Sequence, residues 1–176
     1  MYEHVIMRGN NRRTIFHNNA DYQAFYRILI YAHTQHTFTI IAYCLMTNHY
    51  HLLIRSPEVP LGKVMSLINK RYGDYYRRKY GATGYLYEGR YYAEKADGPK
   101  GILEVSRYIH RNPIAAKEPL APNMEDYPFS SFHYYMTGEK PAFPFIETAH
   151  IFPLLTMPYE QTSESYRRFC EETRQK

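Results

Sequence analysis

The sequence predicts an α+β fold, with strands and helices in the order βαββαβα and an antiparallel sheet. Three observations favour it: short apolar stretches with period two, longer stretches with apolar residues every three or four positions, and turn-forming residues between them. With 176 residues and 44% hydrophobic content, the chain is large enough for one domain with a substantial core. No internal repeat or low-complexity tract interrupts this pattern.

The N-terminal part predicts a strand, a basic turn and a helix. Residues 2–8 are rich in β-forming side chains, and the turn-forming Gly9 ends them. Arg8 and Arg12 flank this turn, where they either contact phosphate or form a solvated basic loop. A helix over about residues 19–33 follows, because its apolar residues recur at three- and four-residue intervals.

The stretch from Ala42 to Arg55 predicts a β-hairpin that carries a histidine pair. Its first strand begins near Phe38, and Thr47-Asn48 supplies the turn. Successive side chains of a strand point to opposite faces, so His49 and His51 share one face and Tyr50 lies on the other. Two neighbouring imidazoles bind a metal ion, hydrogen-bond to an anion, or form an ordinary half-exposed surface pair.

A second predicted helix, residues 61–80, combines an apolar stripe with cations and aromatic rings. Its exposed faces carry the basic residues Lys63, Lys70, Arg71, Arg77, Arg78 and Lys79, interleaved with Tyr75, Tyr76 and Tyr80. Cations hold phosphates and rings stack on bases, so this pattern favours a nucleic-acid surface. A solvated helix whose tyrosines cap the core would show the same pattern. A strand over residues 85–94, broken at Gly89 and carrying Arg90, is predicted next.

A third predicted helix starts at Pro99 or Lys100 and ends at Arg111, because Asn112 precedes a proline. Tyr108 and Asn112 lie four residues apart, on a different face from the apolar stripe. A hydroxyl and an amide oxygen on adjacent turns could complete a metal site that the two histidines begin. The alternatives are a tyrosine at the core boundary and an amide that caps the helix.

The C-terminal part is punctuated by prolines and is predicted to wrap the core as an irregular extension. Short helical pieces are expected at 130–136 and 146–155, and a last helix at about 159–173. The cysteines Cys44 and Cys170 match neither metal nor disulfide spacings, which predicts reduced, structural thiols. No stretch is typical of a signal peptide or a membrane span, so we expect a cytoplasmic protein without a membrane partner.

Composition favours a polyanionic partner. The chain has 20 tyrosines, no tryptophan, a net charge of +5 and a pI near 9.1. Flat amphipathic rings on a basic protein suit single-stranded nucleic acid, although tyrosine is also an ordinary core residue.

Four segments together resemble the single-tyrosine transposases of the HUH class, specifically the branch associated with repetitive extragenic palindromes (REP). They are MRGNNRRTIF, MTNHYHLLIRSP, GYLYEGRYY and RYIHRNPIAA, in this order, and the resemblance spans about residues 2–132. It implies a ferredoxin-like antiparallel sheet with helices on one face, which agrees with the element order above. It also divides the chain into a transposase domain, 1–132, and a C-terminal extension packed on that domain, 133–176.

The resemblance further implies a role for each motif residue. His49 and His51 match the metal-binding histidine pair, with Tyr50 bulkier than the usual central residue. Tyr108 matches the nucleophile that forms a 5′-phosphotyrosine, and Asn112 stands where the third metal ligand is found. The implied cofactor is Mg²⁺ or Mn²⁺, and the implied partner is hairpin or single-stranded DNA. The implied assembly is a monomer or a homodimer.

DNA would be held by basic side chains of the first turn, the second helix and the following strand. The residues expected to contact DNA are Arg8, Arg12, Lys70, Arg71, Arg77 and Arg90. Two other functions remain open at this point. One is a non-catalytic nucleic-acid-binding regulator of repeat elements on the same fold. The other is a metal-dependent phosphodiesterase that activates water, which the lack of an acidic metal ligand disfavours.

Overall fold

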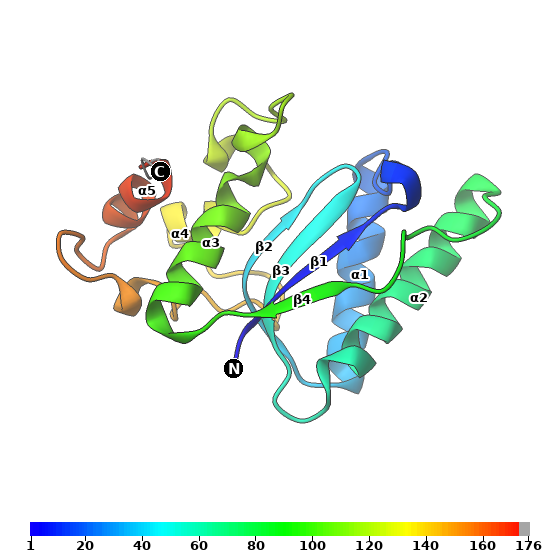
Figure 1. The fold of residues 1–176 in the computed structure, drawn as a ribbon, viewed down its shortest axis with the longest axis horizontal. Coiled ribbons are helices and arrows are strands. Elements are labelled where there is room, and N and C mark those ends of the chain that lie inside the picture. The colour runs from blue at the N-terminus through cyan, green and yellow to red at the C-terminus, as the bar shows by residue number, and fades with distance from the viewer. Residues whose placement is uncertain (173–176) are drawn as a thin grey trace.

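A four-stranded antiparallel sheet forms the centre of the molecule (Figure 1). The computed structural model describes residues 1–172. The strands are β1 (Glu3–Arg8), β2 (Thr39–Leu45), β3 (His49–Arg55) and β4 (Tyr92–Lys95). They lie in the order β2-β3-β1-β4, and each neighbouring pair is antiparallel. The predicted α+β class, with a ferredoxin-like antiparallel sheet, is confirmed.

Helices cover both faces of this sheet. They are α1 (Asn19–Gln35), α2 (Leu61–Tyr80), α3 (Gly98–Ala115), α4 (Phe132–Thr137) and α5 (Ser163–Glu171). Short 3-10 turns lie at Asn10–Arg12, Met124–Asp126 and Phe152–Leu154. The expectation of helices on one face describes α1 and α2 only, because α3, α4 and α5 lie on the opposite side (Figure 1). Every residue of β2 is buried, so its two apolar faces both need cover.

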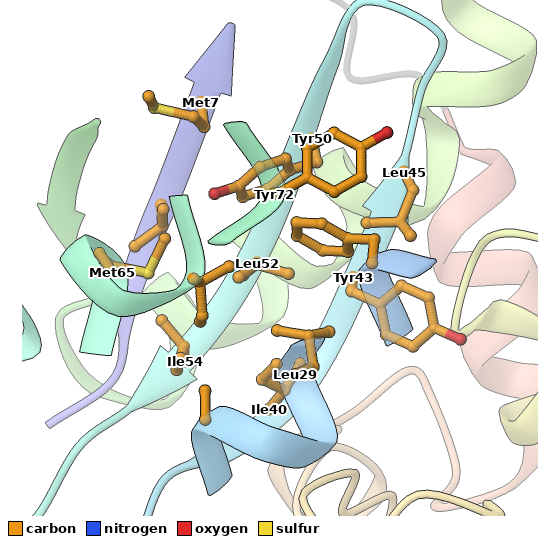
Figure 2. Close-up of a cluster of buried hydrophobic side chains, with 14 of the residues drawn as sticks. Met7, Leu29, Ile40, Tyr43, Leu45, Tyr50, Leu52, Ile54, Met65 and Tyr72 are labelled. Atoms are coloured by element: carbon orange, nitrogen blue, oxygen red, sulfur yellow. The ribbon is translucent and has the colours of Figure 1, made fainter. Parts of the chain in front are cut away.

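The larger core lies between the sheet and helices α1 and α2 (Figure 2). Tyr50 and Leu52 of β3 point into it together with Met65 and Tyr72 of α2. Tyr50 is fully buried, and its hydroxyl donates to Asn69 Oδ1 at 2.5 Å. The alternation predicted for β3 is therefore confirmed, and α2 accommodates the bulky ring between the two histidines.

A second core lies on the opposite face, between β2, α3 and the C-terminal helices. Ile41 and Leu53 of the sheet pack there with Leu103 and Ile109 of α3. Both cysteines are free and buried in this cluster. This packing places α3 across the strand face that carries His49 and His51.

Three predicted boundaries are wrong. β4 covers only 92–95, because the preceding segment is irregular and makes a single bridge from Tyr87 to Gly9. α3 continues through Pro113 to Ala115 instead of ending at Arg111. A proline this near the end of a helix removes only one late hydrogen bond, and its buried ring packs well enough to be tolerated. α5 begins at Ser163, and the end predicted at Thr173 lies outside the described residues.

A buried carboxylate fastens α1 to α2. Asp21 has no exposed side-chain surface and accepts hydrogen bonds from Tyr75, Lys79 and Tyr80. The backbone N–H of His17 donates to it at 2.8 Å. Burial alone would raise the pKa of Asp21, but these hydrogen bonds outweigh it and lower the pKa to about 2.

We expect Asp21 to make stability depend on acid pH. Its pKa is lower in the folded state than its ordinary value of 3.8. The contribution, roughly 2 kcal/mol, is therefore complete above about pH 4 and lost as the pH falls toward 2. Urea unfolding of Asp21→Asn should show a lower stability at pH 7 and a flatter profile between pH 2 and 4. Asp74→Asn removes an exposed ion pair with Arg77 and should change neither, and equal profiles for the two variants would contradict this account.

Candidate functional site

The two histidines of β3 lie side by side on the sheet face covered by α3. Their ring centroids are 4.9 Å apart. His51 is 2% exposed, whereas His49, at the start of the strand, is half-buried. A hydrogen bond of 2.6 Å joins His49 Nδ1 to Asn48 Oδ1, and the side chain of Asn112 also interacts with His49.

A third histidine, which the sequence analysis did not identify, supports His51 from the neighbouring strand. His4 Nε2 lies 3.0 Å from His51 Nδ1, and the two rings are stacked. Nε2 of His51 is buried and has no hydrogen-bond partner among the described residues. The sequence signal was available, because alternation along β1 places His4 on the same face as Arg8.

Tyr108 lies over this imidazole group. It projects from α3 with its ring centroid 5.5 Å from that of His51 and 5.6 Å from that of His4. Its side chain is 54% exposed, so it is not a core-boundary tyrosine. Tyr108 of α3 therefore meets the histidine pair of β3 within one subunit, although the two elements are far apart in the sequence.

Asn112 completes the group one helical turn after Tyr108. Its Nδ2 donates to the Tyr108 carbonyl oxygen at 2.8 Å, which orients the amide, and its side chain also interacts with His49. Asn112, Tyr108 and His49 line one pocket of ≈ 470 Å³. Because α3 continues to Ala115, Asn112 does not cap the helix.

The imidazoles are held in their neutral form. Burial, reinforced by the charge of Arg8, lowers the pKa of His49 to about 4, and a hydrogen bond with Asn112 opposes this in part. Burial lowers the pKa of His4 to about 4 and that of His51 well below its usual value. Neutral imidazoles keep a lone pair for a ligand, so these rings suit metal binding at neutral pH.

The donor set fits a divalent ion. Within residues 1–172, no group of three or more His, Cys, Asp or Glu side chains is placed to hold a metal ion. An ion at this site would therefore need the amide oxygen of Asn112 beside His49 and His51. The unpartnered, buried Nε2 of His51 is what such a ligand requires.

The C-terminal helix borders the same pocket, which the sequence analysis did not foresee. Arg107 and Arg111 of α3 donate to backbone carbonyls at the end of α5, Arg111 to Cys170 O at 2.7 Å. Cations near the C-terminus of a helix stabilise its exposed carbonyls. Glu172 lies beside the pocket as a result.

The predicted DNA contacts fall into separate surfaces. Lys70, Arg77 and Arg90 line a cleft of ≈ 870 Å³ between α2 and the 85–91 segment. Lys70 and Arg71 line a second groove between α1 and α2, where Arg71 stacks on Tyr31 at 3.6 Å. On the other face, the exposed Arg8 lies opposite His49 in the strand pairing.

Arg12 is exposed in the first 3-10 turn.

The tyrosines of α2 do not form the nucleic-acid surface that was predicted for them. The hydroxyls of Tyr75 and Tyr80 bond to Asp21, and that of Tyr76 bonds to the Thr14 carbonyl. These rings hold α2 in place, which supports the structural alternative for them. Among the described residues, the most exposed ring near the cleft is Tyr85, at 84%.

No helix in residues 1–172 is long and apolar enough to cross a membrane.

The family model described as "Transposase IS200 like" matches residues 1–112, which include every residue of the pocket that the sequence predicted. The chain therefore belongs to the IS200-like transposase family. No curated protein sequence matches the chain.

Two solved structures are similar to this one. A REP-associated tyrosine transposase bound to a REP hairpin has 21% identity and a TM-score of 0.65, over 80% of this chain and 82% of that one. A candidate transposase from Deinococcus radiodurans R1 has 15% identity and a TM-score of 0.46, over 63% of this chain and 89% of that one. The first likeness establishes the shared fold.

Proposed function

We propose that this protein is a single-stranded DNA endonuclease and strand transferase of the REP-associated branch. It would nick and rejoin hairpin or REP-type DNA through a 5′-phosphotyrosine on Tyr108. The observation that carries this proposal is the exposed Tyr108 ring, whose centroid lies 5.5 Å from that of a buried histidine with an unpartnered nitrogen. Family membership and the fold of a hairpin-bound relative support it.

The reaction needs a protein nucleophile, because hydrolysis by water would discard the energy of the phosphodiester bond. The Tyr108 oxygen forms a bond to the scissile phosphorus while the bond to the 3′ oxygen breaks. The phenol loses one proton, and the departing strand end gains one as a free 3′-hydroxyl. A later 3′-hydroxyl reverses these steps and releases the tyrosine, so joining requires no ATP.

The residues of the pocket would position the phosphate for this attack. A divalent ion, Mg²⁺ or Mn²⁺, held by His49, His51 and Asn112 would polarise a non-bridging phosphate oxygen and favour in-line geometry. His4 would fix the orientation of the His51 ring through its hydrogen bond to Nδ1. Arg8, opposite His49, adds positive charge where the DNA backbone would enter.

The same chain supplies all these residues, so one subunit is enough to build the site. The proposal holds for a monomer or a homodimer. We also propose that residues 1–132 form the catalytic domain and that 133–176 serve it as an extension. In support, α4 and α5 pack in the same apolar cluster as α3.

A covalent-adduct assay tests the proposal against its two alternatives. Labelled hairpin DNA is incubated with the protein and Mn²⁺ and then analysed under denaturing conditions. A labelled protein band that forms together with cleaved DNA supports the proposal. Cleavage without such a band would indicate a phosphodiesterase that uses water, and binding alone would indicate a non-catalytic regulator.

We expect Lys70 to contribute to DNA affinity through phosphate contact. It lines both grooves of α2, so Lys70→Ala should weaken hairpin binding and lower the slope of log affinity against log salt by about 1. The rate of cleavage at saturating DNA should not change. Lys140→Ala, at an exposed position outside these grooves, is the control. An unchanged salt slope in Lys70→Ala would exclude this surface.

A further inference from the structure

A continuous chain of buried hydrogen bonds joins β2 to the helix that carries Tyr108. It consists of the backbone of Tyr43, the side chains of Ser131, His110, Tyr166 and Ser106, and the backbone of Leu103. All four of these side chains are 0% exposed. Buried polar groups are tolerated when each is paired, and a fully paired network specifies one arrangement of the elements that it joins.

The direction of the chain follows from its α3 end. Ser106 Oγ donates its single hydrogen to the Leu103 carbonyl at 2.9 Å, so it must accept from the Tyr166 hydroxyl at 3.0 Å. The hydrogen of Tyr166 is then used. Its oxygen therefore accepts from Nδ1 of His110, at 2.7 Å.

The sheet end completes the same direction. Because Nδ1 of His110 carries the hydrogen, Nε2 is an acceptor, and Ser131 Oγ donates to it at 2.8 Å. Ser131 Oγ in turn accepts from the backbone N–H of Tyr43 at 2.9 Å. This tautomer of His110 satisfies each bond of the chain, and only the longer contact of 3.4 Å from Ser131 Oγ to the Tyr43 carbonyl then lacks a hydrogen. A shift of α3 along β2 would leave these buried groups unpaired.

We propose that His110 is a positioning residue, which fixes α3 on the sheet so that Tyr108 and Asn112 lie over His49 and His51. His110 lies midway between Tyr108 and Asn112 in sequence. Its ring points into the core, whereas the side chains of Tyr108 and Asn112 line the pocket. The half-exposed Tyr108 meets His4 and His51 in T-shaped ring contacts, which hold it less firmly than full burial would. The position of the phenol is therefore set by the helix.

The role of His110 rests on the proposed function, and it gives the C-terminal extension a part in the proposed reaction. Tyr166 belongs to α5, and Arg107 and Arg111 of α3 hold the end of that same helix. Ser131 and His110 carry the link from β2 to α3. Tyr166 of the extension bonds to His110 and to Ser106, so it holds the His110 ring in the orientation that this link requires. Removing the hydroxyl of Tyr166 should therefore loosen Tyr108, although the two residues are remote in the sequence.

The test compares Tyr166→Phe with Tyr135→Phe. Tyr135 is an equally buried tyrosine of the same cluster, but its hydroxyl donates to the Ile41 carbonyl of β2 and makes no link to α3. We expect Tyr166→Phe to cleave hairpin DNA about 10- to 100-fold more slowly at unchanged DNA affinity, because small misplacements of a nucleophile cost this much. Tyr135→Phe should cleave at the wild-type rate. His110→Phe should match Tyr166→Phe if it folds.

Two readouts that need no catalysis accompany the rates. Mn²⁺ titration followed by electron paramagnetic resonance should show several-fold weaker binding in Tyr166→Phe, since Asn112 is displaced. Hydrogen exchange should accelerate at the α3 amides and not in α2. The inference is overturned if Tyr166→Phe and Tyr135→Phe behave alike in these two readouts. If wild-type protein forms no adduct, the proposed function fails, and the hydrogen exchange still decides whether this chain positions α3.

Discussion

Replacing Tyr108 by phenylalanine should abolish strand cleavage while leaving hairpin binding intact. The substitution removes only the attacking oxygen, and the exposed ring keeps its edge contacts with His4 and His51. Loss of an activated nucleophile lowers turnover on the order of 10³-fold or more. Single-turnover cleavage of a labelled hairpin, with affinity measured in parallel, gives both quantities.

The matched control for this variant is Tyr92→Phe. Tyr92 is also exposed, at 57%, but it lies on β4, outside the pocket, and its hydroxyl donates to Glu94. The Tyr92→Phe protein should cleave at the wild-type rate. Cleavage by Tyr108→Phe within a few-fold of wild type would remove Tyr108 from the chemistry.

Replacing His51 by alanine should eliminate metal binding at the site. Its Nε2 is the buried, unpartnered nitrogen, and alanine provides no ligand atom in its place. We expect Mn²⁺ affinity and Mn²⁺-dependent cleavage to fall by at least about 100-fold, because a ligand matters more than its supporting partners. Calorimetric titration with Mn²⁺ measures the affinity directly.

His4 provides a graded comparison with His51. His4→Leu keeps the ligand but removes the hydrogen bond to Nδ1 of His51, which should weaken metal binding by about 10- to 100-fold. His133→Ala changes a histidine that pairs with Glu139 far from the pocket, and it should leave the affinity unchanged. Equal Mn²⁺ affinity in wild type and His51→Ala would exclude the proposed ligand set.

Local periodicity predicted the parts of the site that lie on regular elements. Alternation along β3 separated His49 and His51 from Tyr50, and the four-residue spacing in α3 placed Tyr108 and Asn112 on one face. These arguments succeed because strand and helix geometry fix side-chain direction within a single element. The family resemblance implied that the residues of β3 and α3 face one another. In the structure, the packing of α3 on β2 brings them together.

The sequence did not predict contacts that depend on which elements pack together. His4 was missed because its partner is 47 residues away, and its role appears only when β1 pairs with β3. The tyrosines of α2 were assigned to a nucleic-acid surface because nothing in their spacing reveals Asp21 on α1 as their partner. α3 was ended too early because the rule that prolines stop helices is weak at the last turn.

The central claim is that Tyr108, and no other tyrosine, becomes joined to the 5′ end of cleaved DNA. The most direct measurement is proteolysis of the denatured protein–DNA adduct, formed with hairpin DNA and Mn²⁺, followed by mass spectrometry of the nucleotide-bearing peptide. The account predicts a single modified peptide that contains Tyr108, with the mass of one phosphodiester-linked fragment. Modification at another tyrosine, or cleaved DNA without any modified peptide, would contradict it.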